Sequence, residues 1–282
     1  MNEVLNHNRH YLIHTVHIKC IYHTTPSANI ISKLALIPLV TGYAPLRRLK
    51  QGIDSMIPKK VKREHRPEEL RLILLMDARF NHNNKLIGKK MMEFGEKHGL
   101  LAEEQYVSRK AKSAIEHALN KRLVIDIARQ QNRECVYIAN DAKSCYDQIL
   151  MTAYLTMVQY GIPEKVAMCT VSCILEMEMK IQTKHRDSEV TYGGDKWIKL
   201  PHGCRQGNGY GPAIWACISS PLLNMLRRRG HRINITSPIT TEELTLRGIS
   251  FVDDTDTVEM QMRNEAWNTL FNRTQRGLDL WE

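Results

Sequence analysis

The chain has 282 residues, 43% of them hydrophobic, and is long enough to bury a core as one large or two small domains. Its longest apolar run, residues 30–40, is too short to span a bilayer, and the N-terminus lacks a signal-peptide stretch, so membrane and secreted classes are excluded and an intracellular location is expected. A formal net charge of +10 favours polyanionic partners, nucleic acid first, although a merely soluble basic surface would give the same charge.

Residues 1–66 are expected to form an irregular, basic entry segment, because prolines interrupt the apolar runs and a cluster of Lys and Arg ends them. Histidines near the N-terminus repeat at three- and four-residue steps, which would place several on one helical face, but they do not match a recognised set of metal ligands. A polar terminal tract is the simpler interpretation of His7, His10, His14, His17, Cys20 and His23.

The seven cysteines are an odd number without paired CxxC spacing, which argues against a disulfide framework or a zinc ribbon. Reduced thiols are therefore expected. Cys169 and Cys173 stand one helical turn apart in an apolar stretch, so we expect them to pack in the core rather than to bind a metal.

Hydrophobic periodicity and turn signals predict a chain in which helices alternate with short strands. In the first half, the predicted elements are an apolar stretch at 68–76, helices at 85–98 and 113–130, and a buried strand at 135–139 that runs on into Asp141. In the second half, they are helices at 144–160 and 164–183, a hairpin at 189–200 that turns at 193–195, a helix at 212–229, short β runs at 244–252 and 255–260, and a last helix from about 264.

Three short motifs carry chemically informative residues, and each has a plain alternative when it is taken alone. The run DAKSCYD at 141–147 places an aspartate at a strand end with an aromatic five residues later, but an aspartate before a helix is also a common N-cap. The run RQGNGYGP at 205–212 has glycines that let a backbone approach a ligand, but it could be a connecting loop. The run FVDD at 251–254 places two adjacent carboxylates at a hairpin tip, where a cation would relieve their repulsion, although turns also favour aspartate.

Together and in this order, the motifs resemble those of reverse transcriptases of retroelements, most closely the non-LTR retrotransposon and group II intron branches. Asp141 and Tyr146 match the family's motif A, Gln206 and Gly207 with the proline at 212 match motif B, and 251–254 match motif C. The spacings are also similar, with about 65 residues from the first motif to the second and about 47 from the second to the third.

Weaker matches to two fingers motifs lie upstream, at 69–81 and 103–114. In the second of them, Val107 stands where the family usually has glycine, which puts the local turn and the placement of Arg109 in doubt. The resemblance covers about 68–280 and stops before the family's motif D, primer grip and thumb. We therefore expect a C-terminally incomplete domain with little processive synthesis.

The resemblance implies an α+β fold: the fingers and palm of a right-hand polymerase, with an antiparallel palm sheet backed by helices and the thumb missing. After the entry segment, residues 67–282 would form this fingers and palm region, and 164–200 would contribute a smaller part of the fingers. The palm sheet would carry Asp141 and Asp253.

The resemblance also implies a mechanism, namely two-metal transfer of a deoxynucleotide onto a primer 3′-hydroxyl on an RNA template. Asp141, Asp253 and Asp254 would be the catalytic residues at two Mg²⁺ ions, with Mn²⁺ as a substitute. Asp141 and Asp253 would bind metal directly, and Asp254 would either hold metal or only shape the turn. Tyr146 would exclude the ribose 2′-hydroxyl. The remaining expected contacts are Gln206, Gly207, Arg71 and Arg109 with the nucleotide, and Lys110, Lys112, Arg227, Arg228 and Arg229 with the nucleic-acid backbone.

The expected partners are an RNA template, a DNA primer and deoxynucleoside triphosphates, without a membrane. Two alternatives remain open: a non-catalytic, nucleic-acid-binding remnant of a decayed element, and an RNA-templated RNA polymerase, against which Tyr146 argues. Nuclear action fits a retroelement, but the only hint of it here is the basic clusters.

Overall fold

The computed structural model describes residues 25–280 with gaps at 45–46, 60–65, 67–68, 111, 143–144, 195–202, 232, 237–238, 247, 252–253 and 263. The N-terminal histidine tract and most of the basic run near 60 lie outside the described residues. The chain divides into two compact units, one formed by residues up to 90 with 146–211 and the other by 91–145 with 212–282. In the described part of the chain, no helix combines the length and hydrophobicity needed to cross a membrane.

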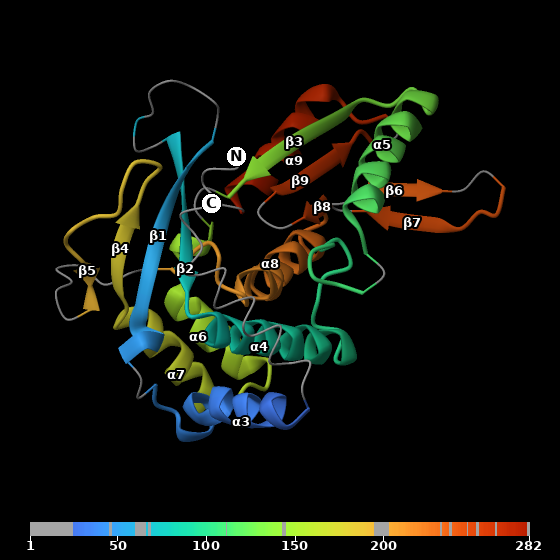
Figure 1. Cartoon of the computed structure of the whole chain (residues 1–282). Coiled ribbons are helices and arrows are strands. Elements are labelled where there is room, and N and C mark those ends of the chain that lie inside the picture. The colour runs from blue at the N-terminus through green and yellow to red at the C-terminus, as the bar shows by residue number, and fades with distance from the viewer. Residues whose placement is uncertain are drawn as a thin grey trace. The chain divides into compact units, whose positions relative to one another are not determined.

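The first unit is built on a four-stranded sheet (Figure 1). Its strands, in spatial order, are β2 (Leu70–Met76), β1 (Gln51–Pro58), β4 (Glu178–Gln182) and β5 (Tyr192–Gly193). β1 pairs antiparallel with β2 and parallel with β4, while β5 pairs antiparallel with β4. The strand at the centre of this sheet therefore comes from the segment that was expected to be irregular.

The helices of this unit are α3 (Thr25–Thr41), α4 (Ala78–Lys97), α6 (Leu150–Gln159) and α7 (Glu164–Leu175). Two short 3-10 turns, η1 (Arg47–Lys50) and η3 (Cys145–Asp147), directly precede β1 and α6 in the chain. α7 lies between α3 and α6 (Figure 1). Cys169 and Cys173 on α7 are buried in one core cluster with Leu74, Met76 and Phe80. The prediction that these two cysteines pack in the core is confirmed.

Two predictions for this unit are wrong. Residues 25–58 are not irregular, since they form α3 and β1; the strand was missed because Asp54 interrupts its apolar pattern, yet this residue is fully buried. The helix predicted at 164–183 ends at Leu175 and is followed by β4; Met177, just before this strand, and Met179 within it are both buried in the core. Neither Gly nor Pro marks this change, so the sequence carries no punctuation there.

Several helix starts also differ from prediction. α4 begins at Ala78 instead of 85, because the Asp77 carboxylate caps it by accepting from the backbone N–H groups of Arg79 (2.9 Å) and Phe80 (3.3 Å). α6 begins at Leu150, after η3, instead of 144. In the hairpin predicted at 189–200, Gly193 and Gly194 adopt positive φ, but Gly193 belongs to β5, which pairs with β4, and residues 195–200 lie outside the described residues.

The second unit contains a three-stranded, fully antiparallel sheet in the order β3 (Cys135–Asp141), β9 (Asp254–Met260) and β8 (Gly248–Phe251). Around it stand α5 (Ala114–Gln130), α8 (Gly211–Arg228) and α9 (Trp267–Asp279), with a separate hairpin of β6 (Ile233–Thr236) and β7 (Glu243–Leu246). The elements β3, β9, α5, α8 and α9 follow the prediction closely. The single β run predicted at 244–252 divides into β7 and β8, which belong to different sheets, and β6 was not predicted. An α+β fold with an antiparallel palm-type sheet backed by helices is confirmed.

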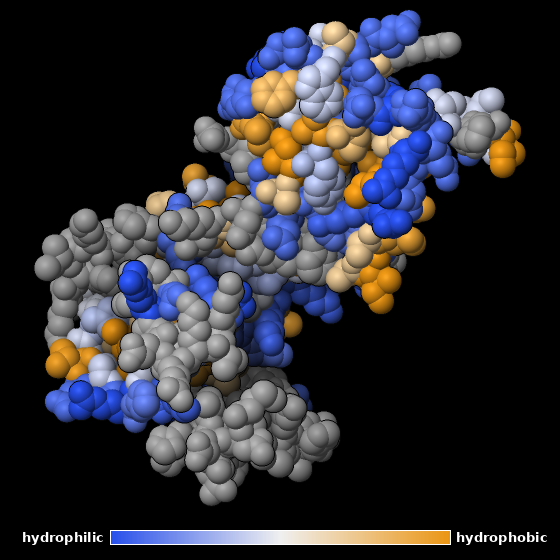
Figure 2. Space-filling view, turned by 90° about the horizontal axis from the view of Figure 1, so that it is seen from above, coloured by the Kyte–Doolittle hydropathy of each residue, from blue (hydrophilic) through white to orange (hydrophobic). Residues whose placement is uncertain are grey.

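α5 begins as its capping signal predicts, with the Ser113 hydroxyl accepting from the Glu116 N–H at 3.1 Å. One face of the helix packs Val124 and Ala128 into a core with β6 and β9. The other face leaves Ile115, Leu119 and Leu123 exposed at four-residue steps. Exposed hydrophobic groups are interspersed with hydrophilic ones on the face shown in Figure 2.

Candidate catalytic site

The end of the antiparallel sheet gathers the acidic residues of two motifs. β3 ends at Asp141 and β9 begins at Asp254, and the backbone register places these two residues directly opposite each other. Phe251, the last residue of β8, is the other partner of Asp254. Asp253 lies outside the described residues, so the structure places two of the three predicted acidic positions, Asp141 and Asp254, at one sheet end.

Asp256 is a carboxylate of this sheet that sequence reasoning missed. It lies on the same face of β9 as Asp254 because strand side chains alternate, but it is buried and forms an ion pair with Lys121 of α5. Burial raises the pKa of the Tyr137 hydroxyl, and its hydrogen bond with Asp256 raises it further. The sequence signal that could have revealed Asp256 is the alternation of acidic residues in DDTD, residues 253–256. Asp256 is neutralised within the protein, whereas Asp254 is exposed.

The residue types at the sheet end fit hard divalent cations. Carboxylate oxygens are what Mg²⁺ prefers, and two carboxylates on adjacent strands need a positive charge between them. Among the described side chains, no group of three or more His, Cys, Asp or Glu residues is placed to hold a metal ion. Asp253 and the side chain of Asp141 are not among these described side chains. The composition of the sheet end therefore supports a metal site there.

The hairpin that carries Asp254 is braced by a buried polar network within the second unit. The side-chain amide of Gln105 donates to Ser219 Oγ (2.8 Å) and Ser250 Oγ (3.1 Å), and Ser250 Oγ lies 3.0 Å from Thr255 Oγ1 across the hairpin. The backbones of Tyr106 and Ser250 are also hydrogen-bonded, at 2.9 Å. The fingers-motif segment around Gln105 thus continues the sheet at the β8 edge, next to the acidic turn.

In the first unit, the motif B loop is fixed to β2. The carbonyl of Gln206 accepts from the Leu74 N–H at 2.8 Å, and Gly207 has φ +104°. A Cβ on Gly207 would lie 2.4 Å from the Leu74 carbonyl oxygen, so only glycine allows this approach. Asn81 of α4 clamps the loop, donating to the Gly207 carbonyl and accepting from the Gly209 N–H at 2.6 Å.

Tyr146 lies in η3 and is held by the same loop. Its carbonyl accepts from the Arg205 N–H at 3.0 Å, which removes that carbonyl from helical pairing and explains why α6 starts late. A Cβ on Gly211 would lie 3.3 Å from the Tyr146 ring, so the ring rests against the start of α8. The half-buried Tyr146 is thus in contact with the motif B loop, which carries the other predicted nucleotide contacts, Gln206 and Gly207.

The two arginines predicted to clamp a triphosphate have different surroundings. Arg71 is exposed on β2. Arg109 forms a fork with Glu96 (Nε to Oε1, 2.7 Å) and donates to the Ala102 carbonyl at 2.7 Å. The left-handed turn of this segment falls on Ser108 (φ +58°), so Val107 avoids the conformation that the family's glycine would provide.

The basic residues predicted to follow a nucleic-acid backbone also divide into two groups. Lys110, Arg228 and Arg229 are exposed. Lys112 places its Nζ 4.5 Å from the centre of the Tyr106 ring, and Arg227 binds both carboxylate oxygens of the buried Glu104 at 3.0–3.1 Å. Arg227 is therefore engaged in holding the second unit together, and its charge is already paired.

A buried carboxylate, Asp54 of β1, stands beside the motif B loop. Its side chain accepts from the Tyr192 hydroxyl and lies 3.7 Å from the Arg205 guanidinium. Burial raises the pKa of Asp54 to about 6, with the charge of Arg205 acting against the rise and that of Asp147 adding to it. Asp54 is a polar residue that the sequence pattern gave no reason to place in the core.

Asp54→Asn is expected to change how stability depends on pH. Because the pKa of Asp54 is higher in the folded chain than in the unfolded one, the folded state binds more protons between about pH 4 and 6, and unfolding free energy falls as pH rises through this window. The variant should lack this fall, so its stability relative to the natural chain should rise by about 2 kcal/mol from pH 4 to pH 7. Urea denaturation of both proteins at both pH values measures the difference, and parallel curves would refute the assignment.

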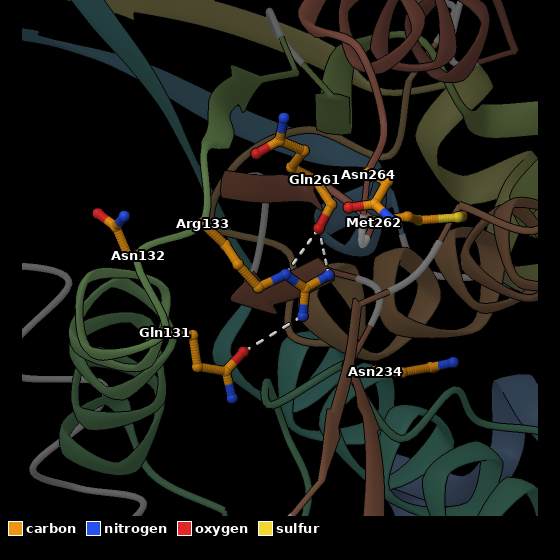
Figure 3. A pocket seen from close by; sticks show the side chains of 7 residues that line it. All are labelled: Gln131, Asn132, Arg133, Asn234, Gln261, Met262 and Asn264. Carbon is orange, nitrogen blue, oxygen red and sulfur yellow. Dashed lines mark hydrogen bonds between the residues drawn. The ribbon is translucent and has the colours of Figure 1, made fainter.

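A polar pocket of about 610 Å³ lies at the opposite end of β3 and β9 (Figure 3). The register pairs Cys135 with Met260 there, six residues along β3 from Asp141, a separation of about 20 Å. Arg133 lines the pocket and donates hydrogen bonds to the Gln261 carbonyl (2.6 Å) and to the Gln131 side chain (3.2 Å). Side-chain amides and Met262 line the rest, and the acidic residues of the site are not among the lining residues.

Comparison with known proteins identifies the family. Residues 57–270 match the family described as reverse transcriptase (RNA-dependent DNA polymerase), and the match includes all three motifs. No curated protein matches the chain. Among solved structures, the chain aligns with an apo telomerase from Candida tropicalis truncated from its C-terminal domain, at a TM-score of 0.47 and 12% identity over 91% of this chain. The alignment covers 52% of the telomerase chain, so this chain spans about half its length. Since the family match extends over more than half of its residues, the chain belongs to the reverse transcriptase family.

Proposed function

We propose that this chain is the fingers and palm part of an RNA-directed DNA polymerase of a mobile element, which adds deoxynucleotides to a primer 3′-hydroxyl. The observation that carries the proposal is the pairing of Asp141 with Asp254 at one end of the antiparallel sheet, with Asp253 adjacent in the chain. Carboxylates from two separate motifs, about 110 residues apart, meet there. A helix cap or a solvated turn alone would not require both.

Asp141, Asp253 and Asp254 would hold two Mg²⁺ ions, or Mn²⁺ in their place. When bound, the ions supply positive charge that stabilises the attacking and leaving oxygens of the phosphoryl transfer. The protein contributes the rigid strand ends that keep the carboxylates together. Lys121 neutralises Asp256, so this neighbouring carboxylate is not needed as a metal ligand in the proposal.

The remaining residues would bind and select the nucleotide and the template. Tyr146 would lie under the sugar and exclude a 2′-hydroxyl, while the backbone of Gln206 and Gly207 would face the nucleotide and the template. Arg71, exposed on β2, is free to meet a triphosphate, whereas Arg109 would first have to leave Glu96. Lys110, Arg228 and Arg229 would follow the phosphate backbone of the primer and template.

Primer extension on an RNA template tests the proposal. The full 282-residue chain with Mg²⁺ and deoxynucleotides should add the first few nucleotides, Asp253→Ala should abolish the addition, and Glu243→Ala should retain it. Glu243 is a suitable control because it is an exposed carboxylate on the separate β6–β7 hairpin.

The outcomes separate the alternatives. Binding of primer and template without any extension by the natural chain would favour a non-catalytic, nucleic-acid-binding remnant. Extension with ribonucleotides in preference to deoxynucleotides would favour an RNA-templated RNA polymerase. Extension that survives Asp253→Ala would refute the assignment of the acidic residues.

A further inference from the structure

Arg205, which directly precedes the motif B glutamine, is surrounded by acidic groups inside the first unit. Its guanidinium lies 3.7 Å from the carboxylate of Asp54, a residue with no exposed surface, and its own side chain is only 14% exposed. Asp147, which follows Tyr146 in the chain, is close enough for the charge of Arg205 to oppose the rise in pKa that burial imposes on it. The guanidinium therefore pairs with the carboxyl group of Asp54 on β1 and adds positive charge near that of Asp147 in η3.

The backbone around Arg205 encloses Tyr146 and Asp147. The Arg205 N–H donates to the Tyr146 carbonyl at 3.0 Å, and Arg205 itself adopts a left-handed φ of +68°. A Cβ on Gly203 would lie 2.1 Å from the backbone of Asp147, and one on Gly211 would lie 3.3 Å from the Tyr146 ring. Loop residues on both sides of Arg205 thus touch the segment that carries the tyrosine.

A left-handed conformation is unfavourable for arginine, so the contacts of Arg205 must hold it in place. The planar fork of a guanidinium can meet two carboxylates at once, which the single ammonium of lysine does less well. The Arg205 side chain also offers little exposed surface to a ligand. Its contacts point to a role in fixing the loop and the tyrosine rather than in touching the substrate.

We infer that Arg205, held beside the buried carboxyl group of Asp54, is a positioning residue that fixes the Tyr146 ring and thereby sets the discrimination between deoxyribonucleotides and ribonucleotides. The inference rests on the proposed polymerase function, and it adds to that function a determinant of sugar selectivity that lies outside the nucleotide contacts. Arg205 acts only through Tyr146, so its effect must vanish when the tyrosine is absent.

A double-mutant cycle tests this dependence. The ratio of kcat/KM for a deoxynucleotide to that for the matching ribonucleotide is measured for the natural chain, Arg205→Gln, Tyr146→Ala and the double variant. Arg205→Gln should lower the ratio about tenfold, because a small displacement of a positioned group is costly. The double variant should show the same ratio as Tyr146→Ala alone. Arg47→Gln, an exposed arginine of the same unit, should leave the ratio unchanged.

Two further variants guard against loss of folding. Arg205→Lys keeps the charge and should retain part of the ratio that Arg205→Gln loses. Asp54→Asn should lower the ratio, because it removes the carboxylate that pairs with Arg205. An unchanged ratio in folded Arg205 variants, or effects that multiply in the double variant, would overturn the inference while leaving the polymerase function intact. A natural chain that incorporates neither nucleotide would refute the proposed function, and the inference with it.

Discussion

Asp141→Asn is expected to reduce nucleotide addition at least about a thousandfold while it stabilises the metal-free protein. The loss follows from removing one negative ligand of the proposed metal ions, at a cost of about 4 kcal/mol in the transition state. The gain in stability follows from the register, because Asp141 and Asp254 stand directly opposite each other and like charges in such a pair repel by up to about 1 kcal/mol. The melting temperature without Mg²⁺ should therefore rise by about 2 °C.

The opposite signs of the two effects make this prediction specific. A variant that lost activity through damage to the fold would melt at a lower temperature than the natural chain. Mg²⁺ should raise the melting temperature of the natural chain and have a smaller effect on the variant. Asp126→Asn, which removes an exposed carboxylate on α5, is the matched control and should keep both activity and the response to Mg²⁺. A lower melting temperature for Asp141→Asn would contradict the repulsion argument.

The parts of the fold that the sequence predicts well are those in which local and tertiary signals agree. The strand that ends at Asp141 has a continuous apolar run over 135–139, followed by the polar Asn140 and Asp141. The helix at 114–130 has both a capping box and an apolar face, and it begins within one residue of its predicted start. Because Asp141 ends one of these elements, the backbone position of this motif A residue was predictable, whereas the motif B loop belongs to no such element.

Buried polar residues are what the sequence could not predict. Asp54, Gln105 and Asp256 all occupy core positions, and a hydrophobic pattern treats such residues as surface. Their burial is possible only because each has polar partners far along the chain, such as Arg205 for Asp54 and Lys121 for Asp256. No local spacing encodes those partners.

The same limit explains the basic residues. Arg109 and Arg227 were predicted to face phosphate, since a basic residue near a motif is most simply assigned to the ligand. In the structure, Glu96 binds the guanidinium group of Arg109 and Glu104 binds that of Arg227, both within the second unit. Charge counts alone therefore overestimate the basic surface that is free to bind nucleic acid, and only the exposed members of the cluster retain that expected role.

Gln105→Leu is expected to show that the acidic hairpin depends on its buried brace. Gln105 is fully buried; its amide nitrogen donates to Ser219 and Ser250, and its oxygen accepts from the Val107 N–H at 3.1 Å. Leucine has nearly the same size but leaves these groups without that partner, so the free energy of unfolding should fall by about 3 kcal/mol. Ser219→Ala, which removes one of the bonds, should cost about 1 kcal/mol.

The effect on activity should exceed the effect on folding. Ser250 pairs with Thr255 across the hairpin, one residue from Phe251 and Asp254, so loosening Ser250 should move the carboxylates that would bind the proposed metal ions. Even at a temperature where Gln105→Leu is fully folded, nucleotide addition should fall about tenfold and need a higher Mg²⁺ concentration. Urea denaturation and a Mg²⁺ titration of primer extension measure the two effects separately. Equal costs for Gln105→Leu and Ser219→Ala would mean that the hydroxyl groups find other partners, and normal activity in the folded variant would mean that the hairpin is rigid without this brace.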